Sequence, residues 1–395
     1  MPVEFLIFGI TLAGVAVFHR QSLSIAAAGL VAVIAFEWLF TQFPAGPGVS
    51  GLIRHFAHEW VILTNLLLLL VGFAMLAAHF EQSGLPKALP RYLPDDWTGA
   101  FALLAIVFVI SAFLDNIAGA LIGGAMAHTL FRGRIRVGYL AAIVAASNAG
   151  GAGSVIGDTT TTMMWISGVP PIEVLHAYIA AGVAFLVFGF SAARAQQRFA
   201  PIIKDPEPLL AIDWPRVLIV VFILVSAVSV NVGVNSKLPE LADRFPFIGT
   251  AVAAALVISI PWRRPDWSVA PGAVKGSIFL LCLVTSASLM PVESLPHPSW
   301  QTAFALGFVS SFFDNIPLTT LALKQGGYDW GVLAYAVGFG GSMLWFGSSA
   351  GVAICNMFPE ARSTGRWLRE GWLIAVAYVA GFAVLLLTLG WQPGG

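Results

Sequence analysis

The sequence predicts an all-α membrane protein with ten transmembrane helices and two re-entrant hairpins, arranged as two inverted repeats. Composition, the lengths of the apolar segments and the distribution of basic residues lead to this prediction. Of the 395 residues, 58% are hydrophobic and only 10% are charged, whereas roughly 25% of the residues of a soluble domain are charged. Such a chain needs the lipid bilayer as its surroundings. The formal net charge of +0 gives no reason to expect a nucleic acid as a partner.

Apolar segments follow one another along the chain, and most have the length of one membrane span, about 20 residues. They cover residues 3–18, 22–42, 60–79, 99–130, 137–167, 172–191, 215–234, 247–261, 272–291, 301–325, 331–357 and 371–391. Little of the sequence remains for a soluble catalytic domain, so these segments dominate the predicted fold.

Two of the apolar segments are interrupted by the same polar pair. Segment 99–130 contains Asp115-Asn116, and segment 301–325 contains Asp314-Asn315. Backbone that is freed by a break at membrane depth must be buried in protein or line a polar cavity. We therefore expect a re-entrant hairpin at each pair, with function concentrated at the breaks.

Basic residues indicate how the segments are oriented. We assume that each hairpin returns to the side from which it enters and that the N-terminus is outside. Arg54, Lys237, Arg244 and Lys324 then lie in outer loops, and the other 16 of the 20 lysines and arginines lie in cytoplasmic loops. Lysine and arginine prefer the cytoplasmic side. The expected location is therefore the bacterial inner membrane, with multiple spans and both termini in the periplasm.

The two halves of the chain have the same expected order of elements. Residues 1–191 give three spans, a hairpin and two spans, and residues 215–395 repeat this order in the opposite orientation, with a cytoplasmic linker at 192–214. Ser111–Ile117 and Ser310–Ile316 are identical at five of seven positions. Inverted repeats whose broken helices meet at the midplane are typical of secondary transporters.

Asp115 and Asp314, one at each break, are the first candidate ion-binding residues. An ionised carboxylate at the centre of a bilayer costs about 2.5–3.5 kcal/mol on insertion scales. A proton or a cation offsets this cost, and one carboxyl group is poorly placed to hold both at once. That competition is sufficient for the exchange of an ion against a proton. The alternative is that each aspartate only caps the helix that follows it.

Asn116 and Asn315 are candidates beside these acids. Their side chains can supply amide oxygens to a cation or amide N–H groups to an anion. Asn is also a favoured turn residue, so ion binding and turn formation both remain open for this pair.

Asp158 is the third candidate acid, and it follows a glycine-rich stretch. Gly150, Gly151 and Gly157 precede it, and Thr159 follows it. Glycines allow a helix to unwind and to expose carbonyl oxygens, which are ligands suited to Na⁺, while threonine adds a hydroxyl ligand. In the second half the equivalent positions are Gly340, Gly341, Gly347, Ser348 and Ser349.

The predicted site therefore holds three acids, Asp115, Asp158 and Asp314, and no buried base to match them. Lysine and arginine lie almost entirely in loops. An anion site usually has a lysine or arginine nearby, although helix N-termini can substitute. We expect the three carboxylates to hold Na⁺, and we expect no resident cofactor.

Two segments resemble one known family. Ser147–Ile166 is similar to a stretch of the NhaD-type sodium/proton antiporters that reads Asn-Ala-Gly-Gly, then Ser-x-Ile-Gly-Asp, then threonines and Met-x-Trp-Ile. Ser111–Asn116 is similar to their Ser-x-x-Leu-Asp-Asn. The second half resembles the family mainly at Asp314-Asn315 and at its Gly-Ser-Ser stretch. These antiporters belong to the ion transporter superfamily, which also contains citrate and other carboxylate carriers and arsenite permeases.

The resemblance implies a two-hairpin fold, an elevator-type carrier and a homodimer. The chain departs from the antiporter pattern at Val155, where the family usually has Pro, and at Ile117-Ala118-Gly119, where the antiporters tend to have Leu-Thr. Carboxylate carriers of the superfamily tend to have Ser-Asn-Thr at the hairpin tips. An acid takes that Ser position twice in this chain, which favours a cation as the primary substrate.

Two transport functions remain open. Antiport of Na⁺ or Li⁺ against H⁺ by alternating access is the first, and a cation-coupled carrier of citrate or a similar anion is the alternative. An intramembrane aspartyl protease is disfavoured, because those enzymes resemble a Gly-x-Gly-Asp pattern and Val155-Ile156-Gly157-Asp158 lacks the first glycine. We therefore expect a transporter and not an enzyme.

Two further polar positions receive structural interpretations. Glu37-Trp38 lies near the outer end of a span and is expected to be an interfacial anchor. His128 precedes a basic turn, and an isolated histidine near an interface is expected to be structural and not a proton relay.

Overall fold

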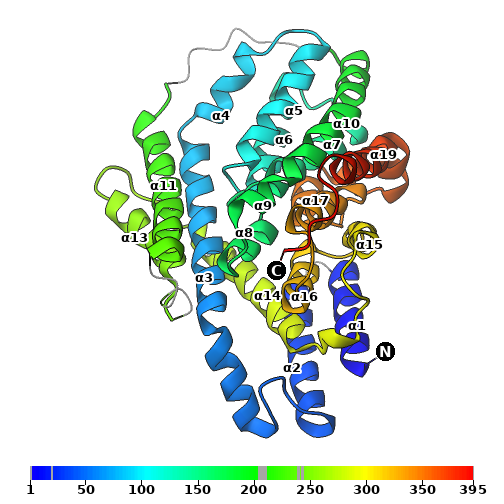
Figure 1. Ribbon diagram of the computed structural model, residues 1–395. Coiled ribbons are helices and arrows are strands. Elements are labelled where there is room, and N and C mark those ends of the chain that lie inside the picture. The colour runs from blue at the N-terminus through cyan, green and yellow to red at the C-terminus, as the bar shows by residue number, and fades with distance from the viewer. Residues whose placement is uncertain (1, 19–20, 203–210, 238–240, 242–243, 395) are drawn as a thin grey trace.

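The protein is helical throughout the residues that the structure describes. A computed structural model describes residues 2–18, 21–202, 211–237, 241 and 244–394. The regular elements in these ranges are helices, and one isolated β-bridge joins Phe43 and Gly46. This arrangement confirms the predicted all-α class (Figure 1).

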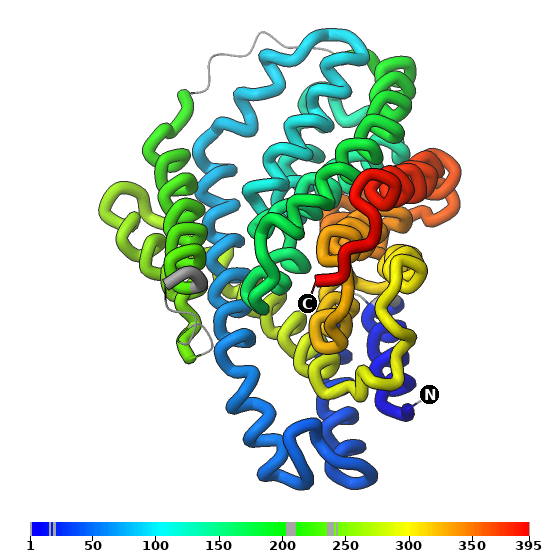
Figure 2. Tube along the Cα trace, in the orientation of Figure 1, coloured from blue at the N-terminus to red at the C-terminus, as the bar shows by residue number. Residues whose placement is uncertain are grey.

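The first half of the chain contains a long helix followed by several shorter ones. Its helices are α1 (Val3–Val17), α2 (Ser22–Phe40), α3 (Gly48–Gln82), α4 (Leu85–Ala88), α5 (Trp97–Ser111), α6 (Asn116–Leu130), α7 (Val137–Ala152), α8 (Thr159–Ile166), α9 (Pro171–Leu175) and α10 (Ala177–Phe199), with a 3-10 turn η2 (Leu89–Tyr92). The tube view shows α3 running along most of the length of the molecule (Figure 2).

The second half contains a comparable series of helices. They are α11 (Trp214–Lys237), α13 (Phe247–Ser259), α14 (Ala270–Leu289), α15 (Trp300–Ser310), α16 (Asn315–Gln325), α17 (Trp330–Gly340), α18 (Ser349–Met357) and α19 (Thr364–Leu389), with the 3-10 turns η3 (Val292–Ser294), η4 (Gly341–Met343) and η5 (Pro359–Ala361).

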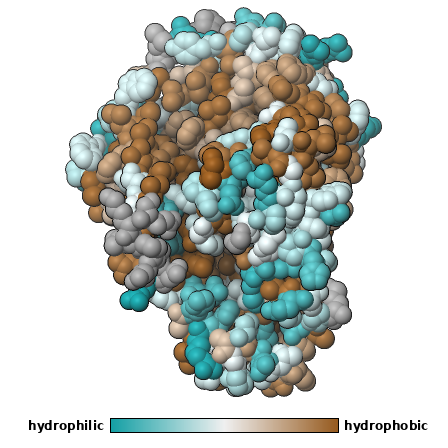
Figure 3. Space-filling view, viewed as in Figure 1, coloured by the Kyte–Doolittle hydropathy of each residue, from teal (hydrophilic) through white to brown (hydrophobic). Residues whose placement is uncertain are grey.

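Six helical stretches of the described chain are long and apolar enough to cross a membrane. They are Ser22–Phe40, Gly48–Gln82, Pro171–Phe199, Trp214–Val234, Ala270–Leu289 and Thr364–Leu389. The space-filling view shows broad hydrophobic areas over the upper half of one face, with hydrophilic residues along the top rim and the lower end (Figure 3). The chain is therefore a multi-pass membrane protein.

Helices break where the sequence predicted breaks. Residues 112–115 separate α5 from α6, and residues 311–314 separate α15 from α16. The residue at the N-cap position is Asp115 for α6 and Asp314 for α16. Asp is a favoured N-cap residue because its side chain can accept from free backbone N–H groups.

Two boundaries differ from those expected. Helix α3 begins at Gly48, well before the predicted segment 60–79, because a buried face that includes Gly51 and His55 extends the helix beyond its apolar part. Helix α10 continues to Phe199, into the predicted linker.

The extension of α10 is anchored by one buried side chain. Gln196 accepts from the backbone N–H of Arg136 at 2.9 Å and donates to the carbonyl oxygen of Arg134 at 2.9 Å. Residues 203–210 of the predicted linker lie outside the described residues.

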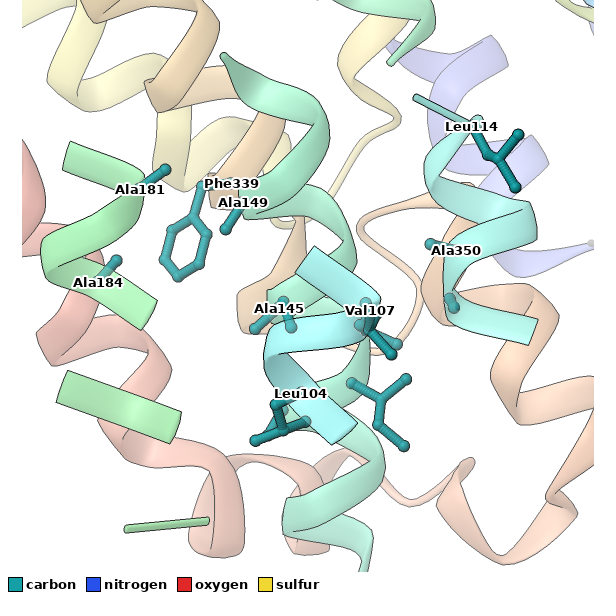
Figure 4. Close-up of a cluster of buried hydrophobic side chains, with 14 of the residues drawn as sticks. Leu104, Val107, Leu114, Ala145, Ala149, Ala181, Ala184, Phe339 and Ala350 are labelled. Atoms are coloured by element: carbon teal, nitrogen blue, oxygen red, sulfur yellow. The ribbon is translucent and has the colours of Figure 1, made fainter. Parts of the chain in front are cut away.

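The main hydrophobic core surrounds α7. This helix is almost entirely buried and packs against α5, α10, α17 and α19. Figure 4 shows Ala145 and Ala149 facing Ala181 and Ala184 of α10, with the ring of Phe339 between the two helices. Small side chains allow helix backbones to approach closely, which favours association in a membrane.

A second hydrophobic core joins α1, α2 and α14 to α16. It contains Phe8, Val33, Leu283 and Leu321, one from each of these helices. A third, smaller cluster contains Leu66, Met163, Val284 and Ile316, and it joins α3 and α8 to α14 and α16. Helix α16 therefore packs against α14 of its own half as well as against helices of the first half.

Candidate ion-binding site

Asp158 lies at the centre of a buried polar network. It is the N-cap residue of α8, and its Oδ1 accepts from the backbone N–H of Thr160 at 2.9 Å. Only 2% of Asp158 is exposed. Its Oδ2 accepts from Nδ2 of Asn116 and from Nδ2 of Asn315, each at 3.3 Å. One carboxylate thus contacts both asparagines of the two Asp-Asn pairs.

Asn148 extends this network to the second half of the chain. Its Oδ1 accepts from Nδ2 of Asn116 at 3.1 Å. Its Nδ2 donates to Oγ of Ser342 at 2.9 Å and to Oγ of Ser348 at 3.1 Å. Sequence reasoning did not assign Asn148 or Ser342 to the site. The available signal was Ser147-Asn148, a polar pair inside an otherwise apolar helix.

Asp314 both caps a helix and contacts a second one. Its Oδ1 accepts from the backbone N–H of Ile316 at 3.2 Å, and its Oδ2 accepts from Oγ of Ser349 at 2.7 Å. Ser348 caps α18 by accepting from the backbone N–H of Gly351 at 3.2 Å. Capping, which the sequence left as an alternative role for the acids, therefore occurs at Asp314 together with a contact to α18.

Four of the predicted ion-binding residues line a cavity of about 260 Å³. Asp115, Asp158, Thr159 and Ser349 line it together with apolar side chains of α3 and α14. The carboxylates of Asp115, Asp158 and Asp314 are close enough to interact electrostatically. The cavity therefore has polar groups from the break before α6 and from the N-terminal ends of α8 and α18, together with apolar side chains.

The glycines near the site allow close backbone approach. A Cβ at Gly150 would lie 2.0 Å from the carbonyl oxygen of Phe108, and a Cβ at Gly340 would lie 2.3 Å from that of Gly307. Both glycines, and Gly151, lie inside helices. The expected unwinding is therefore wrong at these three positions. The glycines there lack a side chain so that neighbouring backbone can pack closely against the helix.

The remaining predicted glycines lie in tighter backbone. Gly341 is in the 3-10 turn η4, and Gly157 and Gly347 lie in the non-helical segments before α8 and α18. A Cβ would lie 2.2 Å from the carbonyl oxygen of Ser111 at Gly157, and 2.4 Å from that of Ser311 at Gly347. The segment before α8 thus packs against the end of α5, and the segment before α18 packs against the break that follows α15.

No basic side chain forms an ion pair with Asp115, Asp158 or Asp314 in the part of the chain that the structure describes. In the same residues no group of three or more His, Cys, Asp or Glu side chains has the arrangement of a metal site. His128 lies near Phe358 and Gly133, at the far end of α6. In the described residues the hydrogen bonds to the Asp158 carboxylate therefore come from neutral donors, the side-chain amides of Asn116 and Asn315 and the backbone N–H of Thr160.

Comparison with known proteins relates the chain to one class of transporter. No family model matches it. The "sodium/proton antiporter 1" of Arabidopsis thaliana is 25% identical in a match that covers 89% of this chain and 66% of the plant protein. The "Na(+)/H(+) antiporter NhaD" of Vibrio parahaemolyticus is 26% identical in a match that covers 83% of this chain and 90% of the relative. The chain is a distant homologue of the sodium/proton antiporters.

A second bacterial antiporter gives the same relationship. The NhaD antiporter of Halomonas elongata is 27% identical in a match that covers 82% of this chain and 74% of the relative. The chain spans about two thirds of the length of the plant antiporter. The homology to NhaD-type antiporters confirms the resemblance found in the sequence, and it relates the chain to transporters and not to enzymes.

Proposed function

We propose that the chain exchanges Na⁺ or Li⁺ for H⁺ across a membrane. The observation that carries the proposal is the setting of Asp158, a buried carboxylate that contacts Asn116 and Asn315 and forms no ion pair within the described ranges. A buried carboxylate without a matching base needs a proton or a cation. The names of the relatives support Na⁺ as that cation.

The neutral groups around Asp158 suit both forms of the site. The amide Nδ2 atoms of Asn116 and Asn315 donate to the carboxylate when no cation is bound. Amide orientation is assigned from the hydrogen bonds, and a half-turn of either amide presents Oδ1, a hard oxygen ligand for Na⁺. Thr159, Ser348 and Ser349 add hydroxyl oxygens. Asp115, Asp158 and Asp314 hold the ion or the proton in this proposal.

The proposal includes two inverted repeats, residues 1–191 and 215–395, joined by the linker at 192–214. Equivalent backbone approaches at Gly150 and Gly340 support it. So does reciprocal packing, because α6 packs against α18 and α16 packs against α8. The breaks at 112–115 and 311–314 are then the tips of two re-entrant hairpins among ten spans.

Transport proceeds by alternating access in this proposal. Each hairpin ends on a helix of the opposite half, so a displacement of the halves changes which side of the site faces water. We place the protein in a bacterial inner membrane with both termini in the periplasm, as the distribution of basic residues favours. A homodimer, which the resemblance implies, completes the proposal.

Everted membrane vesicles test the function. Respiration acidifies their interior, and a fluorescent pH dye reports the release of protons when Na⁺ or Li⁺ is added. The proposal predicts dequenching with either ion, and none with choline or in vesicles without the protein. Uptake of labelled citrate, with no response of the dye to Na⁺ or Li⁺, would instead support the cation-coupled carboxylate carrier.

A further inference from the structure

Glu37 is a buried acid outside the candidate site. It lies near the end of α2, and only 2% of it is exposed, whereas the adjacent Trp38 is 59% exposed. The expected role of Glu37 as an interfacial anchor is therefore wrong, because its side chain points into the protein. Its Oε2 is buried and has no hydrogen-bond partner among the described residues.

Ionisable groups from four other elements face this acid or its surroundings. Glu4 of α1 and Lys324 of α16 interact electrostatically with Glu37. Lys324 also interacts with Glu59 of α3 and with Glu293 of η3. His55 and His58 of α3 lie beside this group, and Nε2 of His55 is 3.0 Å from Oγ of Ser288 on α14.

Lys324 does not neutralise Glu37 by direct contact. Its Nζ donates to the carbonyl oxygen of Met290 at 2.6 Å. Within the described ranges neither Lys324 nor Glu37 forms an ion pair. The group contains four glutamates, at 4, 37, 59 and 293, and one lysine, so it carries excess negative charge when all of them are ionised.

The surroundings favour a proton over a metal cation as the ligand. A metal cation such as Na⁺ needs several oxygen ligands, and the nearby ammonium group of Lys324 repels it. A proton needs only the unpartnered Oε2. Burying an ionised carboxylate without a partner is costly, and binding one proton removes that cost.

We propose that Glu37 is a proton-binding site and that its occupancy controls how firmly α16 is held against α1, α2 and α14. Ionised Glu37 attracts Lys324 near the end of α16. At the start of the same helix, Asn315 contacts Asp158. Nine residues of α-helix, about 14 Å, separate Asn315 from Lys324. A proton on Glu37 removes its attraction for Lys324 and so loosens the C-terminal end of α16. The N-terminal end of α16 contacts the candidate ion site.

Proton binding at Glu37 does not depend on the proposed antiport. Any effect of that proton on ion exchange, through the position of α16, rests on the proposed function. Infrared difference spectroscopy of the purified full-length protein tests the binding step directly, because a carboxylic acid and a carboxylate absorb at different frequencies. The pH is lowered stepwise for the wild type, for Glu37→Gln and for Glu293→Gln, whose glutamate is exposed. The other acids of the chain also absorb as they become protonated, so we expect the wild type and Glu293→Gln to show a carboxylic acid component that Glu37→Gln lacks.

Lys324→Gln keeps the test decisive if Glu37→Gln fails to fold. Removing the ammonium group favours the neutral acid, so the midpoint of the Glu37 band should move to higher pH. Identical titrations of the wild type and Glu37→Gln, or a midpoint that Lys324→Gln leaves in place, would overturn the proposal. A negative result in the vesicle assay with an intact Glu37 band would contradict only the antiport function.

Discussion

Asn315 donates from Nδ2 to both carboxylate oxygens of Asp158, at 3.4 and 3.3 Å, across a sequence separation of 157 residues. Asn116 donates to the same carboxylate from the other Asp-Asn pair. The two pairs therefore converge on one acid that belongs to neither of them.

Asp115→Asn and Asp314→Asn should each abolish exchange, because an amide cannot alternate between a proton and a cation. We expect a loss of at least about tenfold in rate, or ~1.4 kcal/mol in activation free energy. The vesicle assay measures the rate, and immunoblotting of the membranes measures insertion, which should be unchanged. Full exchange activity in either variant would exclude that aspartate from the ion-binding role.

Asn148→Ala should weaken Na⁺ binding and destabilise the protein. The substitution removes the partner of three groups, the amide of Asn116 and the hydroxyls of Ser342 and Ser348. An unsatisfied buried polar group costs about 1–3 kcal/mol. The expected results are a higher KM for Na⁺ and a lower Tm in detergent.

Ser286→Ala is a matched control for Asn148→Ala. The Ser286 hydroxyl is buried, but it only donates to the carbonyl oxygen of Cys282 within its own helix. Its removal leaves the site intact, so KM should not change. A KM that is the same in Asn148→Ala as in the wild type would show that the Asn148 bridge does not support ion binding.

Gly150→Ala and Gly340→Ala should destabilise the protein strongly. The new Cβ would overlap the backbone carbonyl oxygens of Phe108 and Gly307, which cannot rotate away. Overpacking of this kind costs about 1–3 kcal/mol or more. Thermal unfolding of the purified variants measures the effect.

Gly182→Ala provides the control for this pair. Gly182 lies inside α10, and nothing within 4 Å would meet its Cβ. Alanine is favoured over glycine inside a helix by roughly 0.5–1 kcal/mol, so the Tm should stay constant or rise. Equal destabilisation at Gly150, Gly340 and Gly182 would contradict the close-packing explanation.

Much of the local structure was predictable because local sequence determines it. Asp115, Asp158 and Asp314 each occupy an N-cap position at a predicted break, since an acidic N-cap and an interrupted apolar run are both visible within a few residues. The convergence of the Asp-Asn pairs was expected from the repeat. The charge distribution also predicted that the three acids have no buried basic partner, since lysine and arginine lie almost entirely in loops.

The parts that escaped prediction depend on distant residues. Asn148 bonds with side chains 194 and 200 positions away, so its own segment reveals only a polar residue in an apolar helix. A glycine at position 150 or 340 is compatible both with an unwound helix and with close packing, and only the position of the neighbouring backbone distinguishes the two. Glu37 faces inward, and hydropathy does not show which way a residue at the end of a span points.

The loop before α11 gives a prediction about pH. Nε of Arg263 donates to Oδ2 of Asp213 at 2.8 Å, and this bond lowers the pKa of Asp213 below its ordinary value. Because its pKa is lowered, ionised Asp213 stabilises the folded protein at pH values above ~3.9, the ordinary pKa of aspartate. This contribution is lost as the pH falls through the lowered pKa. Asp213→Asn should therefore reduce Tm slightly at neutral pH, because the pair is partly exposed and exposed pairs contribute little.

The difference in Tm between Asp213→Asn and the wild type should shrink as the pH falls through the lowered pKa of Asp213, and it should disappear where both side chains are neutral. Melting curves from neutral pH downwards measure it. A difference that persists unchanged at the acidic end would mean that the ionised form of Asp213 is not what stabilises the loop.

Proton release from the purified protein tests the central claim most directly, because it needs neither a gradient nor a second transporter. Na⁺ or Li⁺ is added to the protein in weakly buffered solution, and a pH dye records the protons released. The proposal predicts release from the wild type with both ions, none with choline, and none from Asp158→Asn. Binding of Na⁺ without proton release, or equal release from Asp158→Asn and the wild type, would contradict competition between the ion and the proton at Asp158.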